Sequence, residues 1–396
     1  MAPDASSSAQ VDEASGAALE QLAQLLDKSL VQAQQGTSGE PRFTMLETIR
    51  EYATERLQES SEEAAVLEQH AQYFLRLAEE AELHLYRPAG RDSWLERLEP
   101  EDANLRVALA WCEARQDRVE TGLRLAGALA WFWYLRGSLH EGRTWLQVLL
   151  AHSDSLDRSV VRGLALSGAG MLALFEGDFA AAAPQEEEAL SIAHEVGDQR
   201  LLAYSGWILG LVRLSQGNIE EARSLFEESH SLFKEVGDAS GEAHTLLTLG
   251  TTAYRSGDLV TARAHLEDSL RLFQAQGDVL HASMMLSALQ GMVSTQGDQE
   301  LARSLHEQSL SLMQQTHNRG TLGLFLINMG DLFHQYGEEQ MAQASYRNGL
   351  SLWQDMHQVE QQLGIVKGLA GRDSSGPGAS GASRATVWGG VSPAPG

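Results

Sequence analysis

Few side chains in this sequence are spaced for catalysis, cofactor binding or metal binding. The segment GAGMLA (168–173) matches the G-x-G-x-x-[GA] pattern of dinucleotide sites, which needs a strand before it and a helix after it. Here the segment lies inside a predicted helix, so we interpret Gly170 as a close-packing position. His-Glu pairs occur at 140–141, 194–195 and 306–307, but in none does a second histidine follow four residues after the first, as zinc binding on one helix requires.

A run of three carboxylates, Glu186-Glu187-Glu188, could supply acid–base groups, but such a run is typical of a solvated helix face, and that is our interpretation. The sequence contains neither the G-x-S-x-G turn of serine hydrolases nor the G-x-x-x-x-G-K-[ST] loop that binds nucleotide phosphates. We therefore expect a protein that is not an enzyme and that has no cofactor and no metal. Aromatic and hydrogen-bonding side chains remain as candidates for binding.

The elements that must position those side chains repeat every 40 residues. The marker glycines are Gly137, Gly177, Gly217, Gly257, Gly297 and Gly337, and five residues after them stand Gly142, Ala182, Ala222, Ala262, Ala302 and Ala342. A glycine in the left-handed conformation can end a helix, and the Asp or Asn after it can cap the next one. A second Gly-Asp break falls 20 residues later in most copies. Each unit is therefore predicted to be two helices of about 17 residues joined by tight turns, and such hairpins bury their apolar faces only by stacking.

This pattern resembles the tetratricopeptide repeat, most closely in LLTLGTTAYRSGDLVTARAHLEDSLRLF (246–273). The usual period is about 34 residues, and the early Trp and late Pro of that motif are missing here. The resemblance implies an all-α fold, a superhelical solenoid of helix hairpins with a 40-residue period. Pro184, inside a predicted second helix, should bend that helix locally.

The resemblance also implies that the first helix of each hairpin lines a concave groove. In the segment AWFWYLRG (130–137), successive residues turn by about 100°, so some of the four aromatic side chains face the core and others can face the groove. The groove positions carried over from the repeat family are Arg124, Trp131, Tyr134, Tyr204, Trp207, His244, Leu247, Thr251, Tyr254, Asp331 and His334. Such side chains suit a protein, a peptide or a small effector. The alternative is that they are ordinary surface or core residues, and for Trp207 in particular the alternative is core.

Upstream of the repeats, the segment ALEQLAQLLDKSLVQ reads as a helix running into a short strand, and RFTMLETIREYATERL (42–57) as a returning strand and a helix with Leu46, Ile49, Ala53 and Leu57 on one face. Helix, hairpin and helix form the second half of a winged helix. With NLRVALAW (104–111) and LAGALAWFWYLRG (125–137), this succession is similar to LuxR/MalT-like regulators of the STAND type. In those regulators an ATPase domain precedes the winged helix, so the resemblance implies an ATPase before Met1 or encoded separately. A split gene, a truncated gene and a misassigned start codon would each give a sequence that begins in this way.

These patterns predict five segments. They are a disordered N-terminus (1–18), a winged-helix remnant (19–60), a helical linker (61–120), tetratricopeptide-like repeats (121–371) and a disordered Gly/Ser/Pro tail (372–396), which is either natural or a frameshift product.

Charge and composition narrow the function classes. The formal net charge is −25 and the chain has one cysteine, Cys112, no secretory signal and no apolar run long enough to span a membrane. We therefore expect a cytoplasmic protein without a membrane partner. Residues 19–57 hold four basic and six acidic side chains, which disfavours direct nucleic-acid binding. The expected function is the sensing and protein-interaction module of a bacterial transcriptional regulator; the alternative is a free-standing tetratricopeptide adaptor or peptide sensor.

Overall fold

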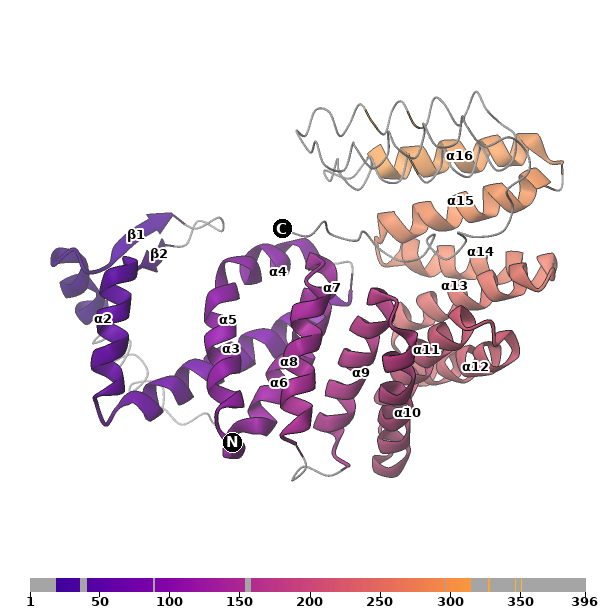
Figure 1. Cartoon of the computed structure of the whole chain (residues 1–396). Coiled ribbons are helices and arrows are strands. Elements are labelled where there is room, and N and C mark those ends of the chain that lie inside the picture. The colour runs from indigo at the N-terminus through magenta and orange to yellow at the C-terminus, as the bar shows by residue number, and fades with distance from the viewer. Residues whose placement is uncertain are drawn as a thin grey trace, which may run out of the picture.

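The computed structural model describes residues 19–35, 41–87, 90–153, 158–295 and 297–314, with isolated positions 327, 346 and 350. The predicted disordered segments, the repeat beyond residue 314 and the glycine at 337 lie outside the described residues. The all-α architecture predicted for the chain is confirmed: apart from one small β-hairpin, the described elements are helices that follow one another as stacked hairpins (Figure 1).

The predicted helix, β-hairpin and helix form at the N-terminal end of the described chain. Residues 19–27 are helical. Strands β1 (Gln32–Gln35) and β2 (Pro41–Thr44) pair antiparallel, and α2 (Glu47–Gln58) follows. The apolar face expected on α2 is covered only in part by the described residues, since Leu46 is 51% exposed and no residue of α2 is fully buried.

A cluster of helices joins this unit to the repeats. It comprises α3 (Glu63–Leu85), α4 (Arg91–Leu98), the short 3₁₀ turn η1 (Glu99–Glu101), α5 (Asp102–Glu113), the 3₁₀ turn η2 (Gln116–Arg118), α6 (Val119–Ala128) and α7 (Ala130–Arg136). The long helix α3 packs on α5 and α6, and α6 also packs on α9 (Val160–Glu176), so the core is continuous from this cluster into the repeats. A single helix of about 17 residues is predicted before Gly137, but Leu129, at ψ −3°, separates α6 from α7.

Helix hairpins follow with the predicted period. Their helices are α8 (Leu139–Ala151), α9, α10 (Phe179–Val196), α11 (Gln199–Ser215), α12 (Ile219–Glu235), α13 (Ala239–Arg255), α14 (Leu259–Ala275), α15 (Val279–Thr295) and α16 (Gln299–Gln314). Within each hairpin the two helices pack along their length, and the second helix packs on the first helix of the next hairpin. Helix α10 continues through Pro184 without a break.

The turns between these helices confirm the glycine prediction. Positive φ angles between 70° and 89° occur at Gly137, Gly177, Gly197, Gly217, Gly237, Gly257, Gly277 and Gly297. The aspartates that follow accept hydrogen bonds from the free N–H groups of the next helix, as Asp238 does from Ser240 and Gly241. Asn218 is an exception, because its side chain makes no capping hydrogen bond.

Small residues lie where the helices of a hairpin approach most closely. A methyl group added at Gly210 would lie 2.5 Å from the ring of Phe226, and one added at Gly250 would lie 2.8 Å from the side chain of Leu266. The close-packing role predicted for Gly170 is confirmed, and Gly210 and Gly250, 40 and 80 residues later, share it.

Candidate aromatic binding face

Aromatic side chains from the first helices of four hairpins, α7, α11, α13 and α15, form a continuous series of ring contacts. Ring centroids are 5.3 Å apart for Tyr134–Trp131, 6.3 Å for Trp131–Tyr204, 5.9 Å for Tyr204–Trp207, 5.5 Å for Trp207–His244 and 4.9 Å for His244–His281. We call these six residues the aromatic row. Five of them are groove residues predicted from the sequence; His281 was not predicted.

The 40-residue period accounts for two members of the row, and helix geometry for two more. Tyr204 and His244 occupy the same position in consecutive hairpins, so they lie at the same height on α11 and α13. Trp131 and Tyr134 stand on α7 three residues apart, which places both on one side of that helix. Their neighbours Phe132 and Trp133 are 1% and 3% exposed and face the core, as the helical geometry predicts.

Burial separates the predicted groove residues that belong to the row into two kinds. Trp131, Tyr134, Tyr204 and His244 are half-buried. Trp207 is 5% exposed and belongs to the hydrophobic core, so for this residue the core alternative holds.

The other predicted groove positions do not join the row. Tyr254 is 41% exposed, Leu247 is buried, and the Thr251 hydroxyl donates to carbonyls of its own helix. Arg124 is held by an ion pair with Glu79 of α3. His334 and Asp331 lie outside the described residues.

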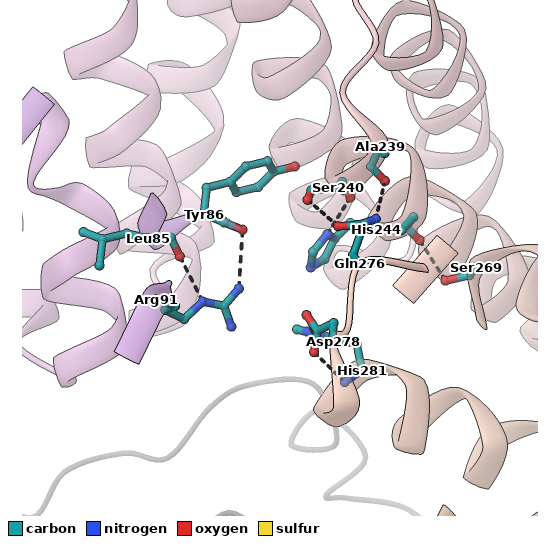
Figure 2. Close-up of polar contacts among 11 residues, drawn as sticks. Leu85, Tyr86, Arg91, Ala239, Ser240, His244, Ser269, Gln276, Asp278 and His281 are labelled. Carbon is teal, nitrogen blue, oxygen red and sulfur yellow. Dashed lines mark hydrogen bonds and ion pairs between the residues drawn. The ribbon is translucent and has the colours of Figure 1, made fainter. Parts of the chain in front are cut away.

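Tyr86, which lies outside the repeat pattern, completes the site. Tyr86, the C-cap of α3, is 8% exposed. Its ring lies 5.3 Å from that of Trp131, 6.0 Å from Tyr204 and 6.0 Å from His244 by centroid distance. Figure 2 shows the ring pointing from the end of α3 toward His244. Because Tyr86 precedes the repeats, no rule based on the 40-residue frame could have found it.

The polar groups at the α13–α15 end of the row are fixed by local hydrogen bonds. The His244 Nδ1 atom lies 2.8 Å from the Ser240 carbonyl oxygen, and burial together with the charge of His281 lowers the pKa of His244 to about 3. His244 is therefore neutral at physiological pH. Burial opposes ionisation of Asp278, but its hydrogen bond to His281 (2.8 Å) prevails and lowers the pKa of Asp278 to about 2 (Figure 2).

Two buried donors at this site have no hydrogen-bond partner among the described residues: the hydroxyl of Tyr86, beside the row, and the indole N–H of Trp207, within it. Both can donate to a carbonyl or carboxylate oxygen. Unpaired donors of this kind are costly in a folded protein, by about 1 to 3 kcal/mol each. An oxygen acceptor brought to the Trp207 N–H by a ligand would remove that cost.

The interpretation of Glu186-Glu187-Glu188 as a solvated face is wrong for the first residue. Glu187 and Glu188 pair with Arg213 and Arg162, but the Glu186 side chain is fully buried between α9 and α11. Its Oε2 atom accepts a hydrogen bond of 2.9 Å from the Ser167 hydroxyl, and burial raises the pKa of Glu186 well above its ordinary value.

The repeat frame contains the signal that was missed at Glu186. This residue stands 40 positions before Phe226 and 80 before Leu266, both of which are core residues. A carboxyl group fits there because Gly170 and Ser167 leave room and supply a hydrogen bond: a methyl group added at Gly170 would lie 2.4 Å from Glu186 Oε1.

Replacing Glu186 by glutamine should stabilise the protein at high pH. The pKa of Glu186 is higher in the folded state than in the unfolded state, where it is about 4.3. Between these two pKa values the folded protein binds more protons than the unfolded protein, so the stability of the wild type falls as pH rises through this window. Each unit of pKa shift corresponds to about 1.4 kcal/mol. Urea unfolding at pH 5 and pH 8 should show a gain for Glu186→Gln that is larger at pH 8. Glu187→Gln, at an exposed site, is the matched control and should show no such trend.

A separate pocket of about 450 Å³ lies at the turns after α7 and α9. Its charged groups already have partners, since Arg143 pairs with Glu176 at 2.7 Å and also with Asp178. Among the described residues, no group of three His, Cys, Asp or Glu side chains is placed to hold a metal ion. No described helix is long and apolar enough to cross a membrane.

The three arginines of the N-terminal unit are engaged with acidic neighbours. Arg42 pairs with Glu101 at 2.9 Å, Arg50 with Glu47 at 2.6 Å, and Arg56 with Glu59. Three arginines that the sequence places in this unit are thus each paired with a carboxylate; direct nucleic-acid binding stays disfavoured only as a prediction from charge.

Comparisons with known proteins support the two-part organisation. Residues 4–58 match the winged helix-turn-helix domain family, and residues 200–275 match the tetratricopeptide repeat family. Over 193 residues, the chain is 35% identical to proteins of Mycobacterium bovis and Mycobacterium tuberculosis described as candidate HTH-type transcriptional regulators. The match covers 46% of this chain and 21% of those relatives, so the chain spans about a fifth of their length.

Solved structures show the same kind of fold at low sequence identity. The apo form of RapI superposes with a TM-score of 0.51 at 15% identity, covering 65% of this chain and 92% of that one. Aspartyl phosphate phosphatase F from Bacillus subtilis has a TM-score of 0.51 at 16% identity, covering 80% of this chain and 76% of that one. These likenesses concern the fold alone.

Proposed function

We propose that this chain is the effector-sensing and protein-interaction module of a bacterial transcriptional regulator of the LuxR/MalT-like STAND type, without catalytic activity of its own. The observation that carries the proposal is the aromatic row, presented by helix hairpins that follow a winged-helix unit. The identity to mycobacterial regulators supports the regulatory role. An ATPase domain, in the same polypeptide or encoded separately, is the proposed partner of the N-terminal unit.

The row favours a peptide or another extended effector over a compact one. Its rings lie on α7, α11, α13 and α15. A single aromatic side chain can contact three of these helices, as Tyr86 does, but a ligand that also reached Tyr134 and His281 at the two ends would have to be longer. Tyrosine and tryptophan dominate binding hot spots because they combine a large apolar area with a polar group. The runner-up function, a free-standing adaptor, would use the same face for a segment of a partner protein.

Transcript profiling tests the regulatory role. In the source bacterium, deletion of the gene and the Trp131→Ala substitution should alter the same set of transcripts. Tyr254→Ala, which changes an aromatic residue outside the row, should leave those transcripts near wild-type levels. A deletion strain with an unchanged transcript profile would contradict the proposed function.

The purified chain should not bind ATP. None of its 396 residues form the glycine-rich loop and lysine that hold nucleotide phosphates. Titration calorimetry with Mg-ATP should give only heats of dilution. A site with micromolar affinity would contradict the assignment of the ATPase to another domain or chain.

A further inference from the structure

Tyr86 is buried by elements far from it in sequence. It ends α3, but its ring contacts come from α7, α11 and α13, which belong to different hairpins. These contacts enclose the ring from several directions: Trp131 is tilted against it, Tyr204 meets it edge-on, and His244 stacks on it at 28°. A single aromatic side chain from outside the repeats thus fills the middle of the aromatic row.

We infer that the end of α3 is an internal ligand of the aromatic row, in which Tyr86 occupies the position of an aromatic side chain of a bound peptide. A peptide with such a side chain competes with Tyr86 for the space between Trp131, Tyr204 and His244. The inference rests on the proposed function and specifies its ligand class and its regulation: the effector must displace a residue that the chain already holds in the site.

Tyr86, the internal ligand, makes ring contacts in the site but leaves polar groups there without hydrogen bonds. The Tyr86 hydroxyl and the Trp207 indole N–H are both buried without a hydrogen-bond partner among the residues described. A peptide carries a carbonyl oxygen at every residue, so a peptide whose aromatic side chain took the place of the Tyr86 ring would bring oxygen acceptors to a site that contains the unpaired Trp207 N–H. An external peptide therefore has an interaction available that the internal ligand does not make.

The end of α3 is held in place by contacts that can be weakened without removing the ring. Arg91, the first residue of α4, donates hydrogen bonds from Nε to the Leu85 carbonyl (3.0 Å) and from a terminal nitrogen to the Tyr86 carbonyl (3.4 Å), as Figure 2 shows. Removing the Arg91 side chain should make the bound position of Tyr86 less populated. When a residue of the same chain occupies the site most of the time, the apparent affinity for a competing peptide falls in proportion to the fraction of time that the site is free.

A synthetic copy of the internal ligand is the probe for this site. The peptide ELHLYR (residues 82–87), blocked at both ends and labelled with fluorescein, is titrated with the full chain and followed by anisotropy. Tyr86→Ala vacates the site, so it should bind the probe at least about ten-fold more tightly than wild type. Arg91→Ala should also bind it more tightly, by a smaller factor. Tyr73→Ala, which removes a tyrosine that is 53% exposed on the same helix, is the matched control and should behave as wild type.

Two further measurements locate the binding. The probe with alanine in place of its tyrosine should not bind the Tyr86→Ala chain, and Trp131→Ala introduced into that chain should abolish binding of the original probe. Far-UV circular dichroism checks that each variant is folded; if Tyr86→Ala is not, Arg91→Ala decides the question. Equal affinity of wild type and these variants, or no detectable binding by any of them, would overturn the inference. The proposed function would then still be judged by the transcript experiment, which does not depend on Tyr86.

Discussion

Trp207→Ala is expected to lower the free energy of unfolding by about 3 to 5 kcal/mol, the usual cost of truncating a large buried aromatic side chain. Trp207 is 5% exposed and packs within the core that runs from α3 to the repeats. Its ring also supports Tyr204 and His244, whose centroids lie 5.9 Å and 5.5 Å away. The cavity would therefore open in the middle of the aromatic row.

Urea unfolding followed by far-UV circular dichroism measures this effect. Tyr254→Ala is the control, because Tyr254 is another aromatic residue predicted for the groove, stands in the adjacent hairpin and is 41% exposed. It should change stability by less than about 1 kcal/mol. If Trp207→Ala unfolds at the wild-type urea concentration, Trp207 is a surface residue and the burial described for it is wrong.

The sequence was sufficient to predict the hairpins because each turn needs a particular residue type. Only glycine readily adopts the positive φ found at Gly177, Gly217 and Gly257, so glycines at a fixed spacing in the sequence indicate those turns. Gly210 and Gly250 indicate close contacts between helices for a steric reason: a methyl group at either position would overlap a neighbouring side chain. Local steric requirements of this kind can be recognised in one sequence.

The candidate site could be predicted only in part because some of its rings are placed by the repeat pattern and others by how the helices pack together. Trp131, Tyr204 and His244 follow from repeat position, and the structure brings them together. Tyr86 does not, since its place depends on how α3 packs against the hairpins, and no local pattern encodes that packing. The position of Trp207 was ambiguous for a geometric reason: a residue three places after Tyr204 is turned by about 300°, near the border between the exposed and buried sides of α11.

Glu186 illustrates a second limit. Charge suggested an exposed residue, whereas repeat position indicated core, and the structure follows repeat position. The carboxyl group is accommodated by compensating changes on neighbouring helices, with Ser167 where later repeats have Trp207 and Leu247. A rule that treats each residue separately cannot detect such compensation, but comparison of whole repeats can.

Ala262→Leu is expected to lower the free energy of unfolding by about 1 to 3 kcal/mol, the usual cost of overpacking a tight interior. Ala262 is fully buried on α14, facing α13. A methyl group added at Gly250 of α13 would lie 3.3 Å from the Ala262 carbonyl oxygen, so the two backbones are already close at this level. The three extra carbon atoms of leucine would force the helices apart.

The effect of Ala262→Leu should reach beyond its own hairpin, because α14 also packs on α15 and stacked repeats support one another. Hydrogen exchange should therefore show faster amide exchange in α13 and α14 and, to a smaller degree, in α12 and α15. Ala264→Leu makes the same substitution two residues away at an exposed position of the same helix and should change neither the urea midpoint nor the exchange rates appreciably. Equal behaviour of the two variants would mean that α13 and α14 do not approach as closely as the structure indicates. A loss confined to Ala262→Leu would show that the small residue recurring every 40 positions is selected by the distance between the helices of each hairpin.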